Sequence, residues 1–188
     1  AFRGYGEKRE YDYSRSGNPT RDALGRALAD LEGGAGAVVT ASGMGAVSLV
    51  TQLFKPDQVA VVPHDCYGGT YRLFNALNLR GALQVRFVDF QDAAALNAAI
   101  ADKPALLWIE TPSNPLLRSV DVAAVAARAR AAGALVVAEN TFLSPVWQQP
   151  LALGADLVIH STTKYLNGHS DVVGGAVIAA TAELHEQV

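Results

Sequence analysis

The chain has 188 residues, of which 50% are hydrophobic and 18% are charged, a balance typical of one folded domain rather than a disordered segment. The formal net charge is -3 and no basic cluster occurs, so the sequence offers no footprint for nucleic acid. No apolar run approaches the roughly 18–20 residues of a membrane span, and no signal-peptide pattern is present at the start. A single cysteine, Cys66, indicates a reducing compartment, the cytoplasm. The four histidines (64, 160, 169 and 185) show no metal-ligand spacing.

The first 17 residues are polar and Gly-rich, with tyrosines at 5, 11 and 13, and we expect an extended arm that lies outside the core. Asn18 and Pro19 then form a helix start, with Asn as N-cap and Pro at the first helical position. Gly33 and Gly34 end this helix. The chain lacks an initial Met and stops at Val188 within a helical pattern, so we expect a fragment of a longer protein.

Beyond this helix, apolar β-type runs alternate with helical patterns, which predicts a mostly parallel seven-stranded sheet with helices on both faces. The expected strands are Ala37–Ala41, Val59–Val62, Val85–Val88, Leu106–Ile109, Leu135–Ala138, Leu157–Ile159 and Ala176–Ala179. The expected helices between them are Gly45–Phe54, Thr70–Leu79, Ala93–Ala101 and Val122–Ala132.

Polar groups follow many of these strands, where the ligands of such sheets bind. The small-residue turn at 42–45 opens a helix and offers backbone N–H groups to an anion. Tyr67 could stack on a flat ring, and Asn114 lies in a polar loop with two prolines. Glu139 and Thr141 follow the fifth strand. The sequence therefore predicts a ligand site at this edge of the sheet.

The sixth strand is followed by Ser161-Thr162-Thr163-Lys164-Tyr165. A lysine that is desolvated at a strand end has a lowered pKa and becomes a usable nucleophile and base. The neighbouring hydroxyls suit a phosphate ester, and lysine, phosphate and an upstream acid together are what a pyridoxal phosphate (PLP) site needs.

Local structural roles remain open for several of these residues. Tyr67 could simply pack under a loop, and Glu139 could face water. His64 and Asp65 more readily shape their loop than react, His169 suits a turn, and Met44 suits a gap in the core.

A rival interpretation treats residues 43–48 as an approximate G-x-G-x-x-G dinucleotide fingerprint with Asp65 downstream. Ser48 replaces the third glycine, and this interpretation leaves Ser161, Thr163 and Lys164 without a role.

Four stretches together resemble the PLP-dependent transsulfuration enzymes of cysteine and methionine metabolism. They are Tyr13–Arg21, Tyr67–Thr70, Glu110–Pro115 and Ser161–Asp171, in the family's order and spacing over nearly the whole chain. Within the family, the stretches Leu31–Ala37 and Pro63–Gly69 favour the γ-synthases over the γ-lyases and β-lyases. The resemblance implies an aspartate-aminotransferase-like (fold type I) large domain at 18–188, preceded by the arm at 1–17.

The resemblance also implies site residues. Lys164 would hold PLP and shuttle protons, while Tyr67 would stack on its ring and Asn114 would lie near the ring hydroxyl or the substrate carboxylate. The phosphate would be bound by Ser161, Thr163 and the N–H groups of Gly43 and Met44, and from a neighbouring subunit by Tyr13 and Arg15.

This chain departs from the family at the acid that faces the pyridine nitrogen, where Glu139 stands in place of aspartate in a Glu139-Asn140-Thr141-Phe142 stretch. The extra methylene requires the carboxylate to fold back or to displace the ring, so we expect PLP binding with reduced turnover. The family's C-terminal domain, with its arginine for the substrate carboxylate, has no counterpart in these 188 residues.

The reaction implied is γ-replacement in methionine biosynthesis, in which O-succinyl-L-homoserine and L-cysteine give cystathionine and succinate. A cystathionine γ-lyase or β-lyase of the same family is the nearest alternative, and a nicotinamide-dinucleotide-binding module or a catalytically idle fragment are alternatives of other classes. The family forms homotetramers built from dimers with shared active sites, so we expect a homo-oligomer with small amino-acid substrates and neither nucleic acid nor membrane as partner.

Overall fold

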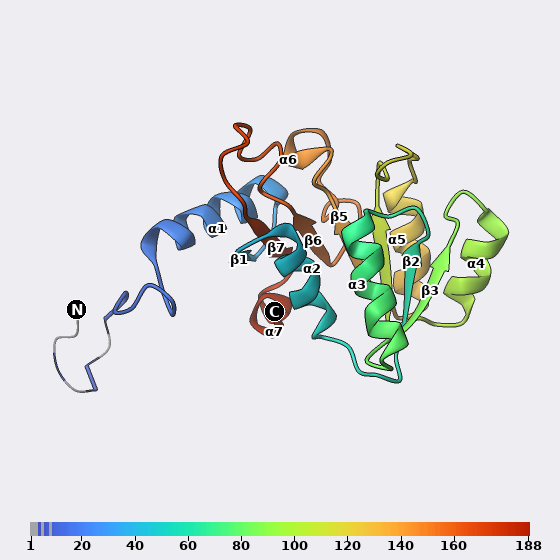
Figure 1. Cartoon of the computed structure of the whole chain (residues 1–188), viewed down its shortest axis with the longest axis horizontal. Helices are drawn as coiled ribbons and strands as arrows, with labels where there is room; N and C mark the ends of the chain where they lie inside the picture. Colours follow the sequence, from blue (N-terminus) through green and yellow to red (C-terminus); the bar gives the residue numbers. More distant parts are fainter. Residues whose placement is uncertain (1–3, 5, 8) are drawn as a thin grey trace.

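The computed structural model describes residues 4, 6–7 and 9–188, and Tyr5 of the predicted arm lies outside these residues. Seven strands form one sheet in the order β1-β7-β6-β5-β4-β2-β3 (Figure 1). The strands are β1 (Gly36–Thr40), β2 (Val59–Pro63), β3 (Gln84–Val88), β4 (Leu106–Glu110), β5 (Leu135–Glu139), β6 (Leu157–His160) and β7 (Gly175–Ala179). The predicted mostly parallel, seven-stranded sheet is thus confirmed.

One strand runs against the others. The pairs β2–β3, β2–β4, β4–β5 and β5–β6 are parallel, whereas β7 is antiparallel to both β6 and β1. As β1 and β6 therefore run in the same direction, the carboxyl ends of β1 through β6 meet at one edge of the sheet, beside the start of β7.

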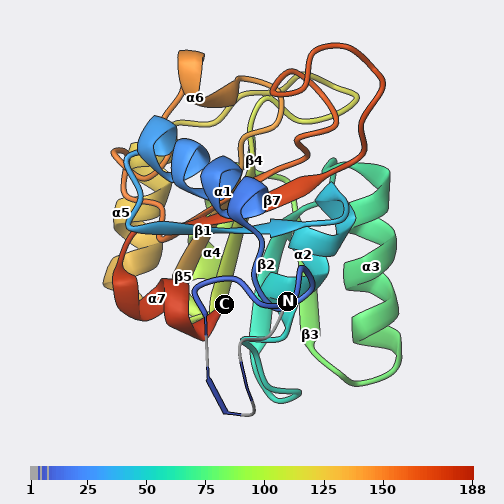
Figure 2. The ribbon, with the colours of Figure 1, turned by 90° about the vertical axis from the view of Figure 1, so that its left-hand side faces the viewer.

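Helices cover both faces, as predicted. The helices are α1 (Pro19–Glu32), α2 (Gly43–Thr51), α3 (Gly68–Leu79), α4 (Ala93–Ala101), α5 (Val122–Ala131), α6 (Ser144–Trp147) and α7 (Ala182–Gln187). One core lies under α2 and α3 and includes Phe74, Trp108 and Ile159. On the opposite face, a second core lies under α4 and α5 and a third under α1. Figure 2 shows α1 on one side of β1 and α7 on the other.

The first helix begins where its cap residues predict. Asn18 accepts hydrogen bonds from the backbone N–H groups of Thr20 and Arg21 at 3.0 and 3.1 Å. Gly33 ends the helix in the left-handed conformation, at φ 72°. The second helix is the one whose bounds differ most from the prediction: it starts two residues earlier than Gly45, because Ser42 caps it through the Gly45 N–H, and it ends at Thr51 rather than Phe54.

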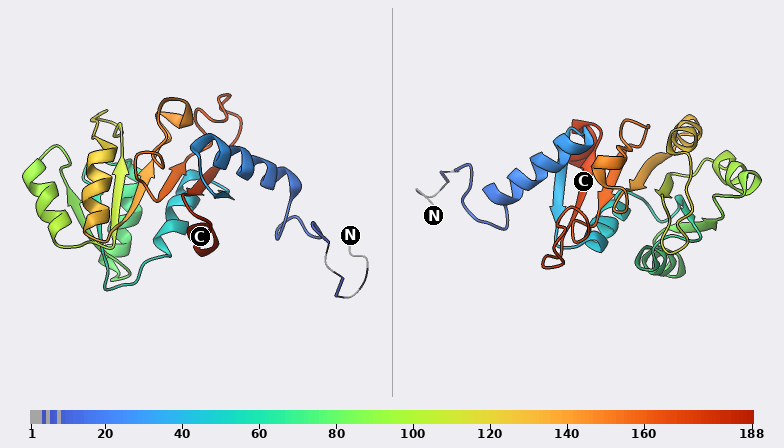
Figure 3. Two further views of the ribbon diagram at one scale, coloured as in Figure 1. Left: turned by 180° about the vertical axis from the view of Figure 1, so that it is seen from behind. Right: turned by 90° about the horizontal axis from the view of Figure 1, so that it is seen from above.

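The described residues of the arm lie away from the sheet, and together with the first turns of α1 they project from the body of the molecule (Figures 1 and 3). Within the described part of the chain, no helix combines the length and apolar character that crossing a bilayer demands.

The strand order removes the dinucleotide-binding interpretation. That fingerprint requires β1 and the strand after α2 to form a parallel β-α-β unit. Here β1 is an edge strand paired only with the antiparallel β7, and β2 lies at the other side of the sheet.

Candidate functional site

The centre of the site is a close contact between the start of α2 and the end of β6. A Cβ atom added to Gly43 would lie 2.7 Å from the Cβ of Ser161, so only glycine allows this approach. Two glycines at the start of β7 are packed as tightly, since a Cβ on Gly175 would lie 2.2 Å from the carbonyl oxygen of Ser42, and one on Gly174 would lie 2.5 Å from Oγ1 of Thr162. The free N–H groups at the start of α2 are thereby held next to the hydroxyl of Ser161, an arrangement suited to an anion.

The two hydroxyls predicted to bind phosphate differ in their surroundings. Oγ1 of Thr163 accepts from the N–H of Gly174 at 3.0 Å and donates to its carbonyl oxygen at 3.2 Å. The hydroxyl of Ser161 makes no hydrogen bond within the described residues. Ser161 is thus the freer of the two donors, and Thr163 fixes the turn before Lys164.

Lys164 itself is exposed in this structure. It lies in a turn in which its N–H donates to the carbonyl of Ser161 at 3.2 Å and its carbonyl accepts from Gly168 at 2.8 Å. The predicted position of Lys164 just after β6 is confirmed. The expected burial, which would desolvate its amine, is not seen within this chain. His169 is exposed, and its Nδ1 lies 2.8 Å from the carbonyl of Asn167, which agrees with a role in the turn.

A short hydrogen-bond chain joins the ends of β5 and β6. Oγ1 of Thr141 donates to Oε1 of Glu139 and accepts from the backbone N–H of Ser161 at 2.7 Å. The N–H of Thr141 lies 3.4 Å from the other carboxyl oxygen of Glu139. The carboxyl group therefore bonds to Thr141, only two residues further along, as a longer side chain that folds back would do.

Burial raises the pKa of Glu139 to about 8, and the nearby Glu110 carboxylate adds to this shift, while the hydrogen bonds from Thr141 oppose it. In the absence of a cation, this carboxyl group is therefore largely protonated at neutral pH.

A second carboxylate, Glu110 at the end of β4, organises the loop that carries Tyr67. The backbone N–H of Tyr67 lies 2.8 and 3.0 Å from the two carboxyl oxygens of Glu110, and the N–H of Asn114 lies 3.2 Å from one of them. Burial raises the pKa of Glu110 to about 7, against the effect of these two hydrogen bonds. The Tyr67 side chain remains 47% exposed at the start of α3 and is thus available to stack on a ligand.

Sequence reasoning did not assign this role to Glu110, although it directly follows the apolar run of β4, as Glu139 follows that of β5. The neighbouring residues act as predicted: Asp65 accepts from the hydroxyl of Ser113 at 2.7 Å and so joins two loops. Met44 packs against the core under α2 and α3, as expected of a residue that fills a gap in the core.

Tyr13 and Arg15 are not brought to the strand ends. Both are exposed in the arm, where the Arg15 guanidinium lies 5.2 Å from the centre of the Tyr13 ring. Any contact that they make with a site must therefore involve another copy of the chain or a movement of the arm.

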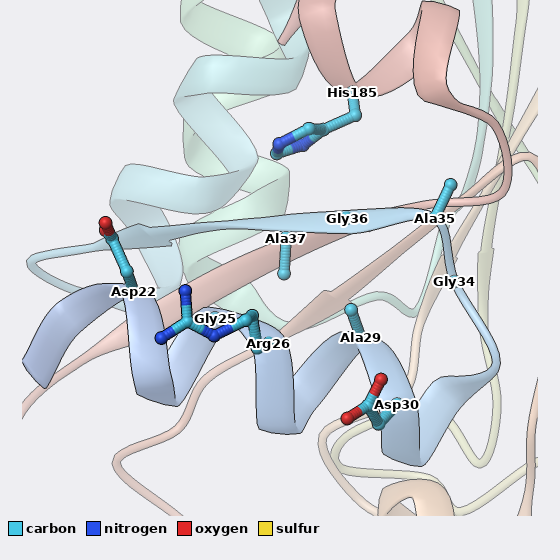
Figure 4. A pocket seen from close by; sticks show the side chains of 10 residues that line it. All are labelled: Asp22, Gly25, Arg26, Ala29, Asp30, Gly34, Ala35, Gly36, Ala37 and His185. Atoms are coloured by element: carbon cyan, nitrogen blue, oxygen red, sulfur yellow. The ribbon is translucent and has the colours of Figure 1, made fainter. Parts of the chain in front are cut away.

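A separate hollow lies at the start of β1, far from these strand ends along the strand. Figure 4 shows it between α1 and α7, with Arg26 and Asp30 on one side of β1 and His185 on the other. None of the predicted site residues lines it.

The raised pKa values predict how the stability of the ligand-free protein depends on pH. In the folded protein Glu139 and Glu110 keep their protons up to about pH 7 to 8, whereas in the unfolded chain they release them near pH 4.5. Their contribution to the free energy of unfolding is therefore complete below about pH 4.5 and is lost as the pH rises through about 7 to 8. We expect the free energy of unfolding to fall over this range, with Glu139→Gln reducing the fall by on the order of 2 kcal/mol.

Urea unfolding at pH 5, 6.5 and 8.5 measures this effect, and Glu186→Gln, at an exposed position, is the control. Identical pH profiles for wild type and Glu139→Gln would contradict the assignment.

Comparison with known proteins identifies the family. A family model described as "Cys/Met metabolism PLP-dependent enzyme" matches residues 2–188. Cystathionine γ-synthase of Escherichia coli (strain K12) is 63% identical over 179 residues, which are 95% of this chain and 46% of that protein. Cystathionine β-lyase of Coxiella burnetii is 48% identical over 95% of the chain and 46% of its own length.

The fold agrees with solved structures of the same group. A crystal structure of cystathionine γ-synthase from Xanthomonas oryzae pv. oryzae in complex with cystathionine has a TM-score of 0.96 and 60% identity, and the match covers 100% of this chain and 49% of that one. The chain thus spans about half the length of the relatives it matches. It belongs to the family of PLP-dependent enzymes of cysteine and methionine metabolism.

Proposed function

We propose that this chain is the cofactor-binding domain of a γ-replacement enzyme that converts O-succinyl-L-homoserine and L-cysteine into cystathionine and succinate. The arm at residues 1–17 and the large domain at 18–188 would be its two parts. The observation that carries the proposal is the contact of Gly43 with Ser161 beside Lys164, because it combines an anion cradle and an amine at one strand end. Relatives named cystathionine γ-synthase, at 63% and 60% identity, support the choice of reaction.

The residues at the strand ends fit PLP in their chemistry. The N–H groups of Gly43 and Met44 and the hydroxyl of Ser161 would hold the phosphate, with Thr163 fixing the turn. Lys164 would bind the aldehyde carbon through its amine. The contact of Gly43 with Ser161 leaves no room for a Cβ atom, so the backbone at the start of α2 comes directly up to the Ser161 side chain.

The aromatic ring of the cofactor would lie between the groups that follow β2, β4 and β5. Tyr67 would stack on its face, Asn114 would lie near its hydroxyl or the substrate carboxylate, and Glu139, oriented by Thr141, would face its nitrogen. A protonated ring nitrogen beside Glu139 would lower the pKa of this carboxyl group back toward its ordinary range. Bound PLP supplies an electron sink for the bonds at the substrate's α-carbon.

The amine of Lys164, just after β6, is suited to move protons once the bound cofactor and substrate cover it. After it leaves the cofactor it could take a proton from the α-carbon of the substrate and return it elsewhere. Tyr67, held through its backbone by Glu110, would keep the flat ring in place while this occurs.

The arm favours a shared site between subunits. The arm segment before α1 extends away from the sheet (Figure 3), its residues Tyr13 and Arg15 are exposed, and the fork of an arginine pairs well with phosphate. We infer that they reach the cofactor phosphate of a second copy, in a homotetramer built from two such dimers. The single cysteine is buried and free, in keeping with a cytoplasmic protein.

The reaction products distinguish the proposed function from the lyase alternative. That alternative is supported by β-lyase and γ-lyase relatives at 44–48% identity. With O-succinyl-L-homoserine and L-cysteine, we expect the intact enzyme to form cystathionine and succinate in equal amounts, measured by mass spectrometry. Lys164→Ala, the control, should lower the rate by about 10²–10⁴-fold or more, since it removes the acid–base group.

Ketoacid and ammonia as the main products from cystathionine, with no γ-replacement, would instead assign a lyase. A protein that binds PLP but turns over neither substrate would support the idle-domain alternative.

The position of Glu139 generates a separate prediction. Shortening it to aspartate removes the methylene that bends the carboxyl group onto Thr141. Because a displacement on the order of 1 Å can cost about 10²-fold in rate, we expect Glu139→Asp to raise kcat severalfold at saturating PLP. Glu139→Gln, which removes the charge, should lower it. Equal or lower turnover for Glu139→Asp would show that the wild-type carboxylate is already well placed.

A further inference from the structure

Three polar side chains meet on the face of the sheet opposite the proposed cofactor site. Glu32 ends α1, Asn140 directly follows β5, and His160 ends β6, and their side chains are 1%, 0% and 0% exposed. Glu32 is separated from His160 by 128 residues in the sequence, so only the fold brings them together. None of the three has a role in the function proposed above.

One oxygen of Glu32 connects both strand ends. Its Oε1 lies 2.5 Å from Nε2 of His160 and accepts from Nδ2 of Asn140 at 2.9 Å. Asn140 also donates to the carbonyl of Gln148 at 2.8 Å and accepts from Nε2 of Gln148 at 3.0 Å. Both N–H groups and the oxygen of the Asn140 side-chain amide are thus bonded, and its orientation is set by partners on both sides.

Side-chain alternation places this network directly behind the cofactor residues. Val137 and Ile159 belong to the core under α2 and α3, whereas Ala138 and Val158 belong to the cores on the opposite face. The residues that continue each pattern are Glu139 and Ser161 on the α2 face, and Asn140 and His160 on the other. Each strand end therefore carries one proposed cofactor group and, next to it, one member of the network.

The hydrogen bonding within this network is incomplete. Oε2 of Glu32 and Nδ1 of His160 are buried and have no hydrogen-bond partner among the described residues. An incompletely bonded buried pair of this kind is commonly no more stabilising than apolar residues of the same volume. What the pair does provide is a fixed geometry between β5, β6 and α1.

We propose that Glu32 is a positioning residue for the cofactor: through Asn140 and His160 it fixes the spacing between the carboxyl group of Glu139 and the hydroxyl of Ser161. The ring of PLP is rigid and a short link joins it to the phosphate, so its ring nitrogen and phosphate lie within a narrow range of separations that the strand ends must match. This inference rests on the proposed cofactor site. It also makes α1, which follows the projecting arm, part of the support of the site.

The test compares PLP affinity in variants of the network. We expect Glu32→Gln and His160→Leu to weaken PLP binding on the order of tenfold. His160→Gln, which keeps an N–H donor near the position of Nε2, should remain within about threefold of wild type. Thr51→Val is the matched control, because it removes a buried hydroxyl that bonds only to Ser48 within α2.

The readouts are the dissociation constant for PLP, from titration of the cofactor-free protein, and the melting temperature with and without PLP. A double variant of Glu32→Gln and His160→Leu should bind PLP about as weakly as either single variant, because the two side chains act as a unit. PLP affinities within twofold of wild type for Glu32→Gln and His160→Leu, with only the melting temperature lowered, would overturn the inference. A wild-type protein that takes up no PLP would instead contradict the proposed cofactor site itself.

Discussion

The structure depends on close backbone packing at the edge of the sheet where β1 and β6 end and β7 begins. Gly43, Gly174 and Gly175 have no room for a side chain, and each contacts a residue of another segment at the same edge. Because β7 runs against its neighbours, its first residues lie beside the last residues of β1 and β6. This packing brings the start of α2 against Ser161, and the anion cradle is a direct result of it.

The residues on the two faces of the sheet have different proposed roles at this edge. Residues on the α2 and α3 face carry the groups proposed to meet the cofactor, and residues on the α1 face hold the strand ends from behind. Thr141 belongs to the first set and Asn140 to the second, so adjacent positions in one loop serve both purposes. Glu110 provides a comparable support for Tyr67 and Asn114 at the end of β4.

Much of the fold could be predicted from the sequence because its strands are apolar throughout and are bounded by polar turns. Every predicted strand was found, with bounds that agree within about one residue, and α4 agrees at both ends. The four-residue helix α6 was not predicted, since it is too short for a periodic pattern and contains Pro145. The antiparallel direction of β7 was not predictable either, because a short apolar run is compatible with both a parallel and an antiparallel strand.

The candidate site, too, could be predicted only in part from the sequence. Residues that directly follow strands, such as Glu139 and Ser161, could be found by position, and the resemblance to the family gave them roles. The hydrogen bond from the Tyr67 N–H to Glu110 and the network around Glu32 join residues 43 and 128 positions apart, and no local pattern indicates such pairs. The exposure of Lys164 also differed from expectation, because burial at that position depends on what covers the strand end.

The proposed function requires that Lys164, just after β6, holds PLP within the cradle of α2. An absorbance spectrum between about 300 and 500 nm, recorded before and after borohydride reduction and followed by peptide mapping, tests it most directly. We expect a band in the near-visible range that reduction removes, and a stable cofactor adduct on the peptide that contains Lys164. Absence of such a band after addition of PLP, or an adduct on another lysine such as Lys55 or Lys103, would contradict it.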